Sequence, residues 1–198
     1  MPEGMKYEIR SLISADAGEA SAVVQESFLA LAAAYWHPDA SSCFLATTAP
    51  APLQKRLTKM ALAAGAFSEG GMAGVILMPS PSLLGALFVR PRWLRLGIGR
   101  ALWESVRAQI ETRFPEVNTV ELNATPYAVP FYKSVGFVPL SAEFERDGQR
   151  ATRMACWLPA RALGANVIWD SQHQGAGRNA SAEENATTGL DPIDRRKQ

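Results

Sequence analysis

Two short segments of this chain combine residue types that can bind an anion and move a proton. In the first segment, Gly97 and Gly99 are separated by one residue and lead into a helical pattern. The first amides of a helix lack intrahelical acceptors and carry the positive end of its dipole, and glycine lets an anion approach them closely. A strand-to-helix turn without a ligand is the alternative, but the pattern is typical of a phosphate cradle.

The second segment, residues 123–137, contains a tyrosine with possible acid–base chemistry. Tyr132 falls on a short helical stretch that should end at Gly136. A phenol has a reference pKa of about 10, so a positioned tyrosine is protonated at neutral pH and can donate a proton. Packing of Tyr132 and Phe131 onto a sheet is the alternative. Together the two segments predict one cofactor, with a proton donor near its reactive end.

The elements that must position these residues follow from the hydrophobic pattern. The continuous apolar run 83–89 is typical of a buried strand, Gly70 and Gly71 indicate a hairpin, and apolar residues from Ile98 to Ile110 repeat every four positions. Pro38 should end the first helix and leave residues 39–52 irregular. We expect strands at residues 7–12, 65–69, 72–78, 83–89, 119–123, 137–144 and 150–158, and helices at residues 15–34, 53–63, 98–110 and 128–135.

This order of elements predicts an α/β fold with a single mixed, mostly antiparallel sheet flanked by helices. We expect one domain over residues 1–158 and a low-complexity, disordered tail over residues 159–198. The tail is rich in Gly, Ala, Asn, Ser, Glu and Gln after Trp169, and such a segment buries too little apolar surface to offset its ordering entropy. A segment that folds on a partner is the alternative.

Composition excludes several functional classes. The 198 residues are 47% hydrophobic and 20% charged, with a net charge of +1, so nothing favours binding to nucleic acid or an anionic membrane. The N-terminus lacks the apolar core of a signal peptide and no apolar run is long enough to span a membrane, so we expect a cytoplasmic protein. Cys43 and Cys156 show no metal-ligand spacing, and we expect two buried or partly buried thiols and no metal site.

Two nucleotide-binding patterns fit the glycine segment poorly. A dinucleotide-binding turn would place a third glycine where Leu102 stands, and the loop 90–96 is too long for the usual tight turn after the strand. A triphosphate-binding loop requires Gly-Lys-Ser/Thr, which is absent from this segment.

The residues from Phe88 to Leu102 resemble the acetyl-CoA-binding motif of the GCN5-related N-acetyltransferases (GNAT). Residues 123–137 are similar to that family's next motif, in which a strand ends in Asn and Phe-Tyr-x-x-x-Gly-Phe follows. The resemblance covers roughly residues 7–158. It departs from the family at Leu94, where Gln or Arg is usual, and Arg95 or Arg100 would have to supply the missing contact.

The resemblance implies an N-acetyltransferase that transfers an acetyl group from acetyl-CoA, as co-substrate, to a primary amine by direct attack in a ternary complex. It implies that the pantetheine arm pairs with the backbone of Leu87, Phe88 and Val89, that Asn123 contacts the cofactor near its thiol, and that Tyr132 protonates the thiolate. The residues implied to surround the pyrophosphate are Arg95, Leu96, Gly97, Ile98, Gly99 and Arg100.

The acceptor end is less defined. The attacking amine must be neutral, so a base is useful, and Glu121 is a candidate because it shares a strand face with Asn123. Glu69 and His37 are further candidates, and by resemblance residues 35–37 help to wall the acceptor site. The acceptor itself is not identified. A CoA-binding regulatory module without turnover, an interaction protein using the tail, and a homodimer formed through the final hairpin remain open.

Overall fold

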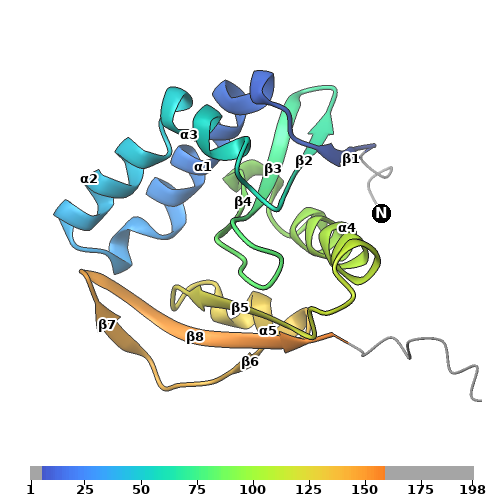
Figure 1. Cartoon of the computed structure of the whole chain (residues 1–198). Coiled ribbons are helices and arrows are strands. Elements are labelled where there is room, and N and C mark those ends of the chain that lie inside the picture. The colour runs from blue at the N-terminus through green and yellow to red at the C-terminus, as the bar shows by residue number, and fades with distance from the viewer. Residues whose placement is uncertain (1–5, 159–198) are drawn as a thin grey trace, which may run out of the picture. The chain divides into compact units, whose positions relative to one another are not determined.

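The chain folds into two four-stranded antiparallel sheets flanked by helices (Figure 1). This computed structural model describes residues 6–158. The first sheet has the order β1-β2-β3-β4, with β1 (Glu8–Ser11), β2 (Leu62–Ser68), β3 (Gly71–Met78) and β4 (Ala86–Val89). In the second, β8 (Gln149–Trp157) pairs with β5 (Thr119–Ala124), β6 (Val138–Pro139) and β7 (Phe144–Arg146). The predicted α/β class of antiparallel strands flanked by helices is confirmed, with the strands divided between two sheets rather than joined in one.

Helices cover both faces of the first sheet (Figure 1). On one side lie α1 (Ala17–Leu31), α2 (Pro38–Thr47) and α3 (Pro50–Leu57), and on the other lies α4 (Ile98–Arg113). The short helix α5 (Val129–Ser134) follows β5. Three 3-10 turns complete the described elements: η1 (Ser14–Asp16), η2 (Ala33–Tyr35) and η3 (Pro91–Trp93). None of the helices within residues 6–158 is long and apolar enough to cross a membrane.

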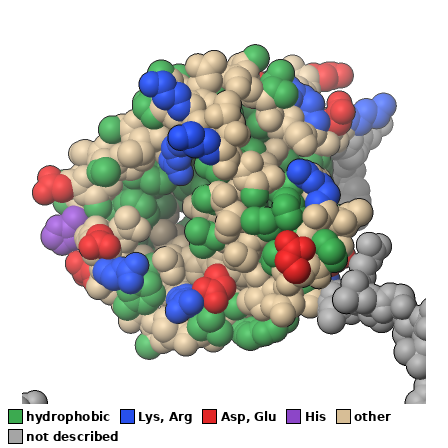
Figure 2. Space-filling model, viewed as in Figure 1, with side chains coloured by type: hydrophobic (Ala, Val, Ile, Leu, Met, Phe, Trp, Pro, Cys, Tyr) green, Lys and Arg blue, Asp and Glu red, His purple; other side chains and the backbone are tan. Residues whose placement is uncertain are grey.

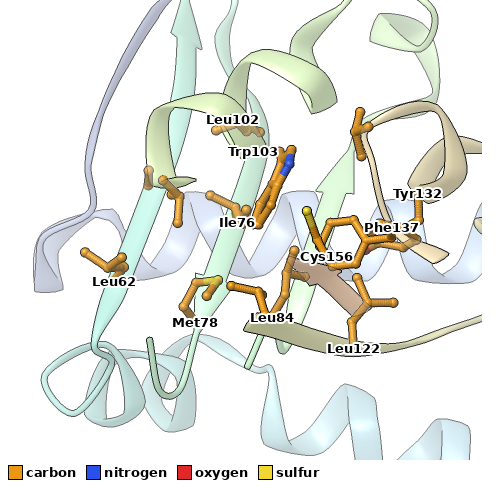
Figure 3. Packing of buried hydrophobic residues seen from close by; sticks show 14 of the residues in the cluster. Leu62, Ile76, Met78, Leu84, Leu102, Trp103, Leu122, Tyr132, Phe137 and Cys156 are labelled. Atoms are coloured by element: carbon orange, nitrogen blue, oxygen red, sulfur yellow. The ribbon is translucent and has the colours of Figure 1, made fainter. Parts of the chain in front are cut away.

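Side chains of β3 alternate between two hydrophobic clusters because successive residues of a strand point to opposite faces. Val75 and Leu77 pack with α1 and α3 in one cluster. Ile76 and Met78 belong to the other, which also contains Trp103 of α4 and residues of the second sheet (Figure 3). The second cluster therefore connects the two sheets through α4.

The structure corrects the interpretation of residues 39–52, which are helical rather than irregular. Pro38 and Pro50 lie in the first turns of α2 and α3, where a backbone N–H has no intrahelical acceptor and its loss costs nothing. The predicted end of the helix at residues 53–63 was wrong, because α3 stops at Leu57 and β2 begins at Leu62. Cys156 is buried as predicted, and burial raises the pKa of its thiol, but Cys43 is exposed.

The two sheets touch at a single parallel bridge among the described strands, between Leu83 and Glu121. Beyond it, β4 departs from β5 at a bulge. Gly85 donates to the carbonyl of Leu77 at 2.9 Å, although the register pairs Leu77 with Ala86, so two residues oppose one. Bulges bend and twist a strand. The bend leaves β4 at the edge of its sheet, which explains why Ala86, Leu87 and Phe88 are half-buried rather than buried on both faces as expected, while Val89 is buried.

The predicted domain boundary at residue 158 and the predicted tail, residues 159–198, lie at and beyond the end of the described residues.

Candidate active site

A pocket of about 480 Å³ lies where the two sheets separate. Figure 2 shows the molecule hollowed between α1 and β4 on one side and β5 and β8 on the other. The pocket is lined from α1 by Leu31 and Ala32, from β4 and the following loop by Leu87, Phe88, Val89, Trp93, Leu94, Arg95 and Gly97, from α4 by Ile98, Gly99 and Arg100, and beyond β5 by Thr125, Tyr127, Ala128, Pro130, Phe131, Tyr132 and Ser134.

Six consecutive backbone amides form a cradle at one end of this pocket. The amides of residues 95–100 donate no hydrogen bond within residues 6–158, and the first helical bond of α4 runs from the Ala101 amide to the Gly97 carbonyl. Arg95 and Gly97 both have left-handed backbone angles, with φ of 64° and 82°. Alternating right- and left-handed residues curl successive N–H groups into an anion-binding concavity, and the helix dipole adds to it. The structure thus gathers the predicted cradle residues at one place.

The two glycines of the cradle serve different purposes. A Cβ atom at Gly97 would meet nothing within 4 Å, so this position needs glycine for its positive φ. A Cβ atom at Gly99 would lie 3.2 Å from the ring of Phe131 and 3.5 Å from Leu87. Gly99 therefore permits α4 to approach α5, the helix that carries Tyr132.

Unpaired backbone groups border the gap on both sides. The Arg90 amide donates across the sheet to the Ala73 carbonyl at 2.9 Å. Because backbone groups alternate in direction along a strand, Leu87 and Val89 turn their N–H and C=O away from β3 and toward the gap. Phe88, which is paired with β3, directs its backbone the other way.

On the other side of the gap, β5 offers the backbone of Asn123. The Glu121 amide and carbonyl bond to the β4 side of the bridge, each at 2.9 Å, so by the same alternation Asn123 faces the gap with its N–H and C=O. The Asn123 side chain is exposed and does not line the pocket. The predicted contact of Asn123 with the cofactor can therefore be made by its main chain, which faces the gap, and not by its side chain.

Tyr132 lies inside the pocket with its hydroxyl unpaired. The residue is 7% exposed, its ring packs edge-on against Phe131 and Phe137, and its hydroxyl has no hydrogen-bond partner within residues 6–158. Figure 3 shows Tyr132 beside Phe137 at one end of the cluster. Burial raises the pKa of the Tyr132 phenol. The group stays protonated at neutral pH and can donate a hydrogen bond into the pocket.

The turn after α5 fixes the position of Tyr132. Gly136 has a φ of 98°, its amide bonds to the Lys133 carbonyl at 3.2 Å, and the Phe137 amide bonds to the Tyr132 carbonyl at 3.0 Å. Such a left-handed C-terminal turn ends the helix at the predicted glycine. The side chain of Arg100 adds a tie, because its Nη2 donates to the Ser134 carbonyl at 2.9 Å.

The candidate bases lie outside the pocket lining. Both Nε and Nη2 of Arg153 donate to Oε2 of Glu121, at 3.0 and 2.6 Å, whereas Oε1 makes no hydrogen bond within residues 6–158. His37 lies 3.7 Å from a carboxylate oxygen of Glu145, and Glu69 is exposed in the β2–β3 turn. The structure does not bring these three side chains together with Tyr132.

Sequence reasoning missed other parts of the pocket. The loop that contributes Thr125, Tyr127 and Ala128 could have been found, because it directly follows a strand next to the predicted site. Leu31 and Ala32 carry no such signal, since their approach depends on how α1 packs on the sheet. Leu94 packs against the core and contributes an apolar wall.

Known proteins share this fold. A family model described as "Acetyltransferase (GNAT) domain" matches residues 23–158. A GCN5-related N-acetyltransferase from Rhodopseudomonas palustris has a TM-score of 0.67 and 20% identity over 80% of this chain and 100% of its own. The PaiA N-acetyltransferase of Thermoplasma acidophilum, solved in complex with coenzyme A, has a TM-score of 0.65 and 19% identity over 78% of this chain and 100% of its own.

The ribosomal-protein-S18-alanine N-acetyltransferase of Escherichia coli is similar at a TM-score of 0.55, with 23% identity over 83% of this chain and 100% of its own. Identities this low show a shared fold. No curated protein matches the sequence.

Proposed function

The chain belongs to the GNAT family of acetyltransferases, and from this premise we propose that it transfers the acetyl group of acetyl-CoA to a primary amine by direct attack in a ternary complex. The observation that carries the proposal is one pocket with unsatisfied backbone amides at residues 95–100 and the unpaired hydroxyl of Tyr132. The unsatisfied amides suit a pyrophosphate, and the Tyr132 hydroxyl suits a leaving thiolate.

The residues of the pocket fit acetyl-CoA along its length. The pyrophosphate would be held by the backbone amides of Arg95, Leu96, Gly97, Ile98, Gly99 and Arg100. The free backbone groups of Leu87, Val89 and Asn123 would pair with the two amides of the pantetheine arm, as a strand pairs with a sheet edge. Phe88 would contact the cofactor through its side chain, since its backbone pairs with β3. When bound, acetyl-CoA supplies an activated acyl group.

In the proposed reaction the neutral amine forms a bond to the thioester carbonyl carbon and the carbon–sulfur bond breaks. The Tyr132 hydroxyl gives its proton to the leaving sulfur, and the proton lost from the amine nitrogen passes to solvent or to Glu121, then back to the phenolate. Glu121 has a free Oε1 for this purpose and would act through water, since it does not line the pocket.

The substitution Tyr132→Phe tests the proposed proton donor. We expect kcat to fall about 100-fold, within the usual range for a lost general acid, because the sulfur then leaves without its proton. CoA affinity should change little, since the ring and its packing remain. Thiol release measures kcat and calorimetry measures the CoA Kd. An unchanged kcat would remove Tyr132 from the mechanism.

A CoA-binding module without turnover is the second candidate. It is favoured by the position of Glu121, whose Oε2 is already paired with Arg153, and by the absence of a carboxylate from the described pocket lining. Calorimetry with CoA beside thiol-release assays over a panel of amines separates the candidates. Tight CoA binding without release from any amine would support the second.

A further inference from the structure

The wall of the pocket opposite α4 is apolar and aromatic. Side chains of β4 alternate between its two faces, so Leu87 packs with the cluster on the α4 side while Phe88 packs with the cluster on the α1 side. Phe88 lines the pocket there together with Leu31 and Ala32 from the end of α1.

Three further aromatic residues support this wall. The rings of Phe88 and Phe44 lie 6.1 Å apart, Phe44 lies 5.2 Å from Trp36 and 4.5 Å from Phe28, and Phe28 is fully buried. Aromatic rings supported from behind cannot turn away easily and present a firm apolar surface. We name Leu31, Ala32 and Phe88 the aromatic wall.

The aromatic wall lies on the α1 face of β4, whereas Leu87, Phe131 and Tyr132 belong to the cluster on the α4 face. Phosphates belong at residues 95–100, at the start of α4, and Gly99 there lies against Phe131, the neighbour of Tyr132, on the same side. An amine that attacks a thioester beside Tyr132 must therefore place its substituent toward the α1 side, against the aromatic wall.

The charges around this end do not suit a second cation. None of the described residues that line the pocket carries a carboxylate. In the β7–β8 hairpin Glu143 pairs with Arg150 at 2.6 Å, Asp147 with Arg146 at 3.6 Å, and Glu145 lies 3.7 Å from Nε2 of His37. Glu121 pairs with Arg153 at 2.6 Å. A second ammonium group buried in the pocket would lose its hydration without a carboxylate in the described lining to pair with, which is costly.

Resting on the proposed acetyl transfer, we propose that the acceptor is a monoamine with an aromatic or similarly large apolar substituent, of the arylalkylamine class, and that polyamines are rejected. The substituent packs on the aromatic wall, and the amine reaches the thioester beside Tyr132.

The test compares three amines with the full chain and acetyl-CoA. Benzylamine carries an apolar ring, 2-aminoethanol has an ammonium group of similar acidity without the ring, and spermidine adds positive charges. We expect kcat/KM for benzylamine to exceed that for 2-aminoethanol about tenfold or more, as burial of an apolar group against a wall allows. Spermidine should be the poorest acceptor. Equal values for all three, or a preference for spermidine, would overturn the inference.

A matched pair of variants locates the effect. Phe88→Ala should raise KM for benzylamine about tenfold and KM for 2-aminoethanol much less, because 2-aminoethanol has no ring to pack on the aromatic wall. Phe114→Ala removes a similar half-buried ring at the end of α4, outside the pocket, and should leave the preference between amines intact. The same KM change in both variants would refute a role for the aromatic wall.

Calorimetry keeps this inference separate from the proposed reaction. If no amine releases thiol although CoA binds, the proposed transfer is wrong. Titration of the CoA complex with benzylamine and with spermidine then still decides: binding of benzylamine alone supports the aromatic wall as an amine site, and binding of spermidine in preference overturns it.

Discussion

Burial gives Tyr132 a protonation state that suits a proton donor. Burial raises the pKa of its phenol, so the group is protonated whenever a substrate arrives. A thiolate leaving into the same apolar surroundings is also penalised as an anion. The apolar site therefore disfavours both the phenolate and the thiolate. The pKa difference between the two groups can stay near that of the reference values, about 10 and 8.5.

The raised pKa of Tyr132 predicts a loss of folding stability at high pH. An unfolded tyrosine ionises near pH 10, whereas buried Tyr132 keeps its proton, so the stability present below that pH is lost as the pH rises above it. Between pH 8 and 11 the wild type should lose about 1.4 kcal/mol more free energy of unfolding than Tyr132→Phe. Denaturant titrations at the two pH values measure this difference, and parallel curves would contradict it.

Glu121 carries two alternative roles that kinetics can separate. As a base, Glu121→Gln should lower kcat/KM about 100-fold at neutral pH, and the loss should shrink at high pH where the amine is already neutral. As a partner of Arg153, it holds an exposed ion pair worth at most about 1 kcal/mol. Arg153→Gln is the control: it should alter stability as Glu121→Gln does and leave the pH profile unchanged. A loss independent of pH would exclude the base role.

At the scale of elements, the first turn of α4 and the helix α5 act as one unit. Gly99 lets the ring of Phe131 lie against α4, and Arg100 binds the Ser134 carbonyl at the end of α5. The amides proposed to hold a pyrophosphate are thereby fixed relative to Tyr132. On the β4 side of the pocket, the bulge at Gly85 turns β4 away from β5 and opens the gap.

Substitution at Gly99 should disturb the site more than the fold. In Gly99→Val the added side chain meets Phe131, so α5 must shift and the CoA Kd should rise about tenfold, or about 1.4 kcal/mol. Gly18→Ala is the control, since a Cβ atom there meets nothing within 4 Å in α1, and it should stabilise the protein by about 0.5–1 kcal/mol without affecting CoA. Calorimetry showing an unchanged CoA Kd in Gly99→Val would refute this coupling.

At the scale of the described domain, the two sheets are separate ladders joined by one bridge and by a shared hydrophobic cluster. Between them lie backbone groups that neither sheet uses. A pantetheine arm in the gap would pair with both edges and complete the hydrogen bonding across it. Ligand binding and the stability of this domain should therefore be strongly linked.

Hydrogen exchange tests this linkage directly. With CoA present, exchange through local openings should slow at the amides of residues 87, 89, 95–100 and 123, and local exchange should remain unchanged at the amides of β1, which lies at the far edge of the first sheet. At a CoA concentration of 100 Kd, stability should rise by about 2.7 kcal/mol, or about 5–11 °C in Tm. Protection spread evenly over all strands would argue against binding in the gap.

Features that depend on short stretches of the chain could be predicted from the sequence. Glycines before a helical repeat predicted the cradle, Gly136 predicted the end of α5, and the spacing from Asn123 to Tyr132 resembled a family motif that the comparisons support. These features depend on backbone angles and on neighbours close along the chain, which side-chain type and order determine.

Only the tertiary structure decided which side of each residue faces the gap. Strand pairing turned the backbone of Asn123, rather than its side chain, toward the pocket, and placed Arg153 on Glu121. Packing of α1 brought Leu31 and Ala32 to the pocket and set Phe88 against Phe44. These contacts join residues far apart along the chain, and a one-residue change of register or bulge reverses a strand's faces, so no local pattern encodes them.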